Sequence, residues 1–165
     1  MFYVKKKYFL IAICCCLANF VFSQHDSVRM KKNTFFLEAL GNGAGILSLN
    51  YDRLIPLNSF YAISLRGGIA YVNSGYLSFP ALINVITGKG NNHFELGIGE
   101  TFENNVYVKK GNYQITTTLD LGYRFQKPDG GIFFKCAYTP IFYNSQDSFS
   151  KIFWLYIGLG IGYTF

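Results

Sequence analysis

One pair of residues in this sequence has the types and spacing that catalysis could use. His93 and Glu95 stand two positions apart, and a histidine beside a carboxylate can support acid–base or nucleophilic chemistry when a serine hydroxyl is near. The other histidine, His25, lies in a polar stretch near the N-terminus. A histidine at the start of an apolar segment commonly marks the boundary of a strand, so we expect a structural role for His93 and no enzyme activity.

Metal and cofactor sites are not indicated by the remaining polar residues. Asp52, Glu95 and Asp120 could bind calcium, but they lack the spacing of an EF-hand loop. Glycines alternate inside apolar segments, as at Gly97 and Gly99, whereas a phosphate-binding loop follows a strand and opens a helix. We therefore expect no metal and no cofactor.

The first 23 residues read as a signal peptide. Lys5, Lys6 and Lys7 form a basic start, residues 8–22 are mainly apolar, and Ser23 suits a cleavage site. The alternatives are a retained anchor, for which the apolar run is shorter than the roughly 20 residues required, and a lipoprotein attached within the run of cysteines at 14–16.

Removal of residues 1–23 changes what charge and cysteine content imply. The net charge falls from +6 to +3, because three lysines leave and all 9 acidic residues remain. The basic character is thus partly a targeting feature, and we expect no nucleic-acid partner. Cys136 would remain alone, so no internal disulfide and no cysteine-based metal site would form.

The elements that must position these residues are short strands. Half of the chain is hydrophobic, 19% is aromatic and only 15% is charged, with 17 Gly and 4 Pro, which argues against disorder and against a helical bundle. After a mobile lead-in at 24–33, alternating apolar and polar positions recur between turn-forming clusters. The predicted strands of the domain 34–165 are 34–41, 46–54, 60–72, 76–87, 93–102, 113–125, 132–142 and 153–165. Such a series predicts an all-β, eight-stranded antiparallel up-and-down barrel.

The two faces of the predicted strands differ in a way that favours a transmembrane barrel. One face is bulky and apolar, while the other carries mostly Gly, Ala, Ser and Thr, where a water-facing surface would carry many Lys and Glu. A membrane barrel turns its apolar face to lipid and its polar face inward. The expected lumenal polar network is Glu38, Asp52, Arg66, Glu95, Asp120, Arg124 and Lys135. The alternative is a soluble lipocalin-like barrel that binds an apolar ligand.

The chain ends in Gly160-Ile161-Gly162-Tyr163-Thr164-Phe165. This ending resembles the C-terminal assembly signal of Gram-negative outer-membrane β-barrels, with Gly160, Tyr163 and Phe165 at the matching positions. Together with the signal peptide and the strand pattern, the chain resembles a small barrel of the OmpA/OmpX type, from an uncharacterised subfamily. The resemblance implies a location in the outer membrane, contact with its lipid and recognition by the barrel-assembly machinery.

With the N-terminus in the periplasm, an even number of strands places both ends of the chain on the periplasmic side. The expected outer loops are 42–45, 73–75, 103–112 and 143–151, and the expected periplasmic turns are 55–59, 88–92 and 126–131. Loops this short, around a lumen just wide enough for side chains, predict a monomeric, structural and non-enzymatic protein. The second alternative is a lipid-modifying enzyme, but outer-membrane lipid A deacylases use His, Ser and Glu on the lipid-facing surface, whereas His93 and Glu95 share the inward face.

Overall fold

The computed structural model describes residues 31–43, 46–72, 76–105, 113–143, 152–153 and 157–165. Almost all of them lie in strands, since the two-residue alternation of the sequence suits a pleated backbone with two different faces. The strands are β1 (Asn33–Ala39), β2 (Leu47–Pro56), β3 (Tyr61–Val72), β4 (Tyr76–Thr87), β5 (Asn92–Asn105), β6 (Tyr113–Gln126), β7 (Gly131–Tyr138), β8 (Ile141–Tyr143), β9 (Ile152–Phe153) and β10 (Ile157–Thr164).

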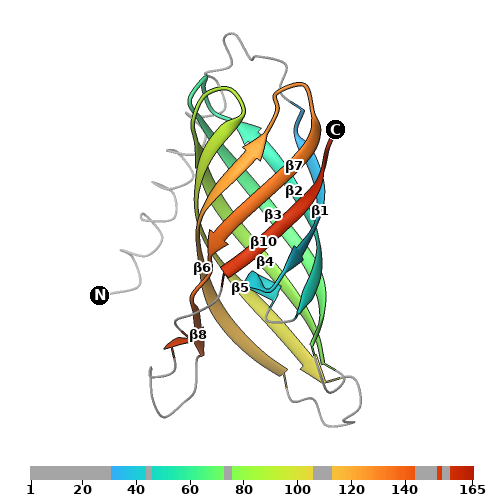
Figure 1. Ribbon diagram of the computed structural model, residues 1–165. Coiled ribbons are helices and arrows are strands. Elements are labelled where there is room, and N and C mark those ends of the chain that lie inside the picture. The colour runs from blue at the N-terminus through green and yellow to red at the C-terminus, as the bar shows by residue number, and fades with distance from the viewer. Residues whose placement is uncertain (1–30, 44–45, 73–75, 106–112, 144–151, 154–156) are drawn as a thin grey trace, which may run out of the picture.

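The strands close into one barrel in which every neighbouring pair is antiparallel (Figure 1). The last strand returns to the first, with Phe36 of β1 opposite Gly162 of β10. The short β8 follows β7 after Thr139 and Pro140, and it pairs with β6 in the register that β7 has with β6; β9 in turn pairs with β8. The expected all-β, eight-stranded antiparallel barrel is therefore confirmed.

Inward and outward positions alternate along each strand. In β1, Phe36 and Glu38 are buried, whereas Phe35 and Leu37 are 50% and 45% exposed. Some inward positions need glycine because the neighbouring backbone occupies the space: a Cβ on Gly162 would lie 2.1 Å from the carbonyl oxygen of Phe35. The alternation thus gives the barrel a filled polar interior and an apolar exterior.

The two ends of the barrel differ. One end carries the C-terminus and the turns 57–60, 88–91 and 127–130, and we call it the C-terminal end. At the opposite end, the expected outer loop 42–45 is wrong in part, because residues 41–43 form a short 3-10 helix, η1, that is buried. The chain turns inward at Leu40 and Gly41, which have φ angles of 58° and 78°. The signal peptide and the expected loop regions 44–45, 73–75, 106–112 and 144–151 lie outside the described residues.

Candidate functional site

Seven charged side chains meet inside the barrel, and each of the six ion pairs among them joins side chains at most 2% exposed. They come from six strands, because inward positions of β1, β2, β3, β5, β6 and β7 converge on one narrow lumen. The residues are Glu38, Asp52, Arg66, Glu95, Asp120, Arg124 and Lys135.

Arg66 and Lys135 hold the end of the network that lies farther from the C-terminal end. The Arg66 guanidinium donates to the Glu38 carboxylate, and its Nη1 lies 3.3 Å from Asp120 Oδ2. Lys135 Nζ is 2.5 Å from the same Asp120 oxygen. Asp120 therefore joins the two cations, which approach it from opposite sides of the lumen in β3 and β7.

Arg124 completes the network toward the C-terminal end. Lys135 Nζ also donates to Glu95 Oε1 at 2.9 Å, and Glu95 Oε2 lies 3.6 Å from Arg124 Nη1. Arg124 Nη1 is 2.5 Å from Asp52 Oδ2. The ion pairs thus form one chain in which the sign of the charge alternates, in the order Glu38, Arg66, Asp120, Lys135, Glu95, Arg124 and Asp52. Each cation lies between two carboxylates, which is how charges are tolerated away from water.

Neutral side chains orient the two guanidinium groups. Asn50 Oδ1 accepts from Arg66 Nε at 3.2 Å, and Gln126 Oε1 accepts from Arg124 Nε at 2.7 Å. Each arginine also lies 4.8 Å from the centre of an aromatic ring, Phe36 for Arg66 and Phe133 for Arg124. The network is therefore held by hydrogen bonds and ring contacts as well as by charge.

Asn42 of η1 adds a contact that sequence reasoning missed. Its Nδ2 donates to Asp120 Oδ2 at 2.9 Å, its Oδ1 accepts from the Thr118 hydroxyl at 2.7 Å, and its backbone carbonyl accepts from the Thr101 hydroxyl at 2.7 Å. The Ser78 hydroxyl donates to the carbonyl of Gly43. The inward turn is therefore bound to β4, β5 and β6 and covers the network from the end opposite the C-terminus.

Replacing Asn42 by Ala should destabilise the barrel by about 2 kcal/mol, because one hydrogen bond to a charged group and one to a hydroxyl are lost while both partners stay buried. The urea midpoint of the folded species on a gel measures the effect. Asn91→Ala is the control, since Asn91 lies in an exposed turn where its backbone carbonyl still accepts the Gln126 N–H at 2.9 Å. A midpoint equal to that of the control would contradict a structural role for Asn42.

An apolar cluster fills the C-terminal end of the lumen. Leu54, Ala62 and Ile86 are buried together near the ends of β2, β3 and β4. From this end to the other, the interior thus holds an apolar cluster, then the charge network, and then the η1 turn. The interior of an eight-stranded barrel is just wide enough for side chains such as these to fill it.

The residues with possible catalytic chemistry have other partners. His93 is buried, and its Nε2 lies 3.3 Å from the carbonyl oxygen of Gln126, while the Glu95 carboxylate is held by Lys135 and Arg124. Within the described part of the chain, no group of three or more His, Cys, Asp or Glu residues could hold a metal ion. Cys136 is a free cysteine on the exposed face of β7. No helix among the described residues is long and apolar enough to cross a membrane.

The three residues of the expected C-terminal assembly signal, Gly160, Tyr163 and Phe165, lie on two faces of the last strand. Gly160 faces inward opposite Glu38 and Lys135, whereas Tyr163 and Phe165 face outward and are 60% and 46% exposed. Phe165 stacks on Phe35 with ring centres 5.8 Å apart, and its backbone N–H donates to Asn33 O at 2.8 Å. The end of the chain is thus part of the seam that closes the barrel.

A closed antiparallel barrel with a packed polar interior and an apolar exterior is the fold of the small outer-membrane β-barrels. The chain is similar to the crystal structure of the N-terminal β-barrel domain of Pseudomonas aeruginosa OprF, with a TM-score of 0.54 and 15% identity over 81% of this chain and 96% of that domain. It also aligns with Ail, the attachment invasion locus protein of Yersinia pestis, with a TM-score of 0.33 and 13% identity over 82% of this chain and 100% of that one. No protein-family model and no curated protein matches the sequence.

Proposed function

We propose that this protein is an outer-membrane barrel that spans the membrane and serves a structural, non-enzymatic role. One observation carries the proposal, namely the inverted polarity of the barrel. Among the described residues, 30 large hydrophobic side chains are exposed, whereas the buried set contains 21 polar or charged residues and 9 hydrophobic ones. A barrel in water has the opposite distribution, and a barrel in lipid has this one.

The same distribution argues against a soluble ligand carrier. An apolar ligand would have to lie in the lumen, where Arg66, Asp120 and Lys135 form buried ion pairs. The exterior would meanwhile place an apolar surface in water far larger than soluble monomers usually expose. In the proposed orientation the C-terminal end faces the periplasm, and the exposed aromatic rings near that end, such as Tyr61 and Tyr163, lie at the membrane boundary.

The test is the fate of the full chain in a Gram-negative cell. We expect the mature protein in the outer-membrane fraction, after removal of residues 1–23, and we expect the unheated sample to migrate differently from the boiled one on a gel. Lipid A from expressing cells should keep its mass, since the proposed role is non-enzymatic. Recovery in the soluble periplasmic fraction would overturn the membrane location, and a changed lipid A mass would overturn the non-enzymatic role.

Deleting Phe165 should reduce the amount of folded protein in the outer membrane several-fold, because the resemblance to outer-membrane assembly signals implies that the terminal aromatic residue is recognised before the barrel closes. The yield of refolding into short-chain lipid in vitro should fall less, because no assembly machinery operates there and only the contacts with Phe35 and Asn33 are lost. The measurement is the heat-modifiable fraction in each setting. Phe165→Tyr is the control because it keeps a terminal ring. An unchanged yield of folded protein in cells would contradict a role of Phe165 in assembly.

A further inference from the structure

The apolar exterior is interrupted by one row of small and polar residues. Gly67 of β3 pairs with Ala81 of β4, Ala81 pairs with Glu100 of β5, and Glu100 pairs with Thr117 of β6. We call Gly67, Ala81, Glu100 and Thr117 the polar row. The neighbouring outward rows are apolar: Leu65, Ile83, Ile98 and Leu119 on one side, and Ile69, Phe79, Phe102 and Ile115 on the other.

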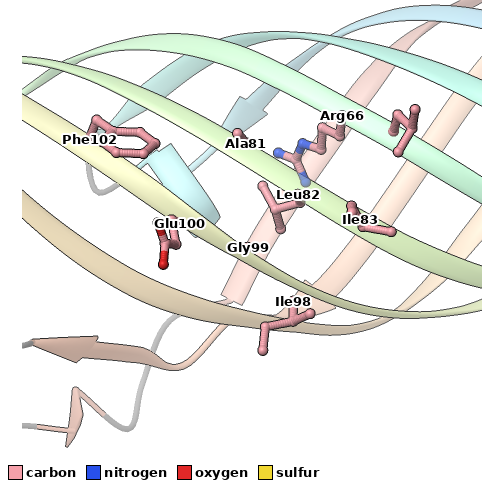
Figure 2. Close-up of a pocket in the computed structure, with 9 residues that line it drawn as sticks. Arg66, Ala81, Leu82, Ile83, Ile98, Gly99, Glu100 and Phe102 are labelled. Carbon is pink, nitrogen blue, oxygen red and sulfur yellow. The ribbon is translucent and has the colours of Figure 1, made fainter. Parts of the chain in front are cut away.

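Two members of the polar row, Ala81 and Glu100, line a hollow in the barrel wall. The hollow has a volume of about 390 Å³, and its lining includes the outward side chains of Leu65, Ile83, Ile98 and Phe102 as well as the inward residues Arg66, Leu82 and Gly99. Figure 2 shows the small side chain of Ala81 on β4 and the longer ones of Glu100 and Phe102 on β5. Ala81 is the smallest outward side chain in this lining, and its partner on β3 is Gly67, whereas the outward neighbours of Ala81 along β4 are Phe79 and Ile83. Gly67 and Ala81 lie near the middle of their strands, and therefore near the middle of the apolar band.

The backbone is also interrupted beside this hollow. The pairing of β3 with β4 runs to Gly67 and Ala81 and resumes at Ala70 and Ser78. Pro80 lies in the gap and has no N–H to donate to the neighbouring strand. The wall of the barrel is therefore less regular here than along the continuous register of β5 with β6.

Glu100 and Thr117 present polar groups to the outside without a partner in the described part of the chain. Glu100 is exposed and Thr117 is partly exposed, and neither side chain takes part in a hydrogen bond or ion pair among the described residues. Ionisable and hydroxyl groups at this depth of a membrane are costly when they face hydrocarbon, and they are normally found against another protein segment that supplies a partner. An acyl chain would fill the hollow but would bring no donor to the carboxylate.

We propose that the polar row is the contact surface for a second copy of this chain, forming a two-fold symmetric dimer within the membrane. This inference rests on the proposed membrane location. A two-fold axis along the membrane normal preserves depth, so the row of one copy meets the same row of the other. Glu100 then accepts from Thr117 of the second copy, and the reverse contact forms as well. Gly67 and Ala81 allow the two backbones to approach closely.

The two polar side chains of the row complement each other across a two-fold axis. The acceptor at Glu100 and the donor at Thr117 are neighbours on adjacent strands, so one two-fold rotation satisfies both pairs at once. The hollow beside them receives large side chains such as Phe102 and Ile98 of the second copy. The proposed dimer differs from the monomer expected from the sequence, and its contact surface comes together only through the register across four strands.

Sedimentation equilibrium of the folded full-length protein in density-matched micelles tests the proposal. We expect a dimer whose dissociation constant rises about tenfold in Glu100→Leu and in Thr117→Val, because each removes two reciprocal hydrogen bonds. Glu100→Gln keeps an acceptor and should dimerise almost as the unchanged protein does. Ala81→Trp fills the hollow and should abolish the dimer, whereas the matched control Ile161→Trp, on the outward face of β10, should leave it intact.

Each outcome separates this inference from the proposed function. A protein that shows heat-modifiable folding and membrane insertion but sediments as a monomer overturns the dimer and leaves the membrane barrel standing. A dimer that responds to Ile161→Trp and not to Ala81→Trp overturns the polar row as the contact surface and likewise leaves the membrane barrel standing. Failure of the unchanged protein to enter the membrane fraction overturns the proposed location itself, and with it the dimer.

Discussion

Replacement of Arg66 by Met is expected to lower the stability of the barrel by about 3–5 kcal/mol, because removal of one member of a buried ion pair leaves the others without compensation. Glu38 would lose its only ion-pair partner in the described part of the chain, and Asp120 would keep Lys135 alone; both carboxylates are fully buried. Asn50 Oδ1 would also lose the two hydrogen bonds that it accepts from Arg66, from Nε at 3.2 Å and from Nη2 at 3.1 Å. The urea midpoint in micelles or in lipid measures the loss.

Arg53→Met is the matched control for this change. Arg53 is also an arginine of the barrel wall, but it is exposed, and its guanidinium donates to Asn33 Oδ1 at 2.6 Å near the C-terminal end. Loss of such an exposed contact should cost within about 1 kcal/mol. The double variant Arg66→Met with Glu38→Gln should recover part of the stability, since it removes one of the uncompensated charges. Equal midpoints for Arg66→Met and Arg53→Met would show that Arg66 is not in a buried network.

Replacement of Leu96 by Arg should destabilise the barrel in lipid by up to about 2–4 kcal/mol, since the cost of an arginine that faces hydrocarbon reaches that value at the bilayer midplane and falls toward the interfaces. Leu96 faces outward, is 52% exposed and lies between Val85 and Leu121 on the neighbouring strands. Its exposure is to lipid in the proposed location, so the cost comes from placing a charge in hydrocarbon. Refolding yield and the urea midpoint in lipid vesicles give the magnitude.

A soluble barrel would respond to Leu96→Arg quite differently. An exposed position in water tolerates arginine within about 0.5 kcal/mol. Leu96→Met is the control variant, because it keeps the position apolar and should have a mild effect in either environment. If Leu96→Arg and Leu96→Met had the same midpoint in lipid, the apolar exterior would not be the face that meets the membrane.

The direction in which most side chains point follows from the sequence alone. In β6, Thr118, Asp120 and Arg124 share the inward face, while Leu121 and Tyr123 share the outward one. Successive residues of a strand point to opposite sides, so a local two-residue pattern is sufficient to sort them. The eight-stranded architecture follows from the same pattern repeated between turn-forming clusters.

The closed barrel determines which of the inward residues contact one another. Arg66 and Asp120 are 54 positions apart and belong to strands that are not neighbours. Their contact depends on the register of each strand pair and on the width of the lumen, and no local pattern carries that information. The rings of Phe36 and Phe133, whose centres are 5.0 Å apart, show the same limit, since an apolar residue on a polar face gives no sign of its partner.

The inward course of the turn after β1 is not predictable for a different reason. The glycine-rich sequence around Asn42 correctly predicts a turn, but a turn pattern does not say whether the chain continues into solvent or back into the lumen. The left-handed backbone at Leu40 and Gly41 directs it inward, and the acceptors and donors at Asp120, Thr118 and Thr101 hold it there. Local periodicity therefore determined the faces of the strands, whereas the ion pairs, the inward turn and the polar row depended on strand register and backbone direction, which only the tertiary structure sets.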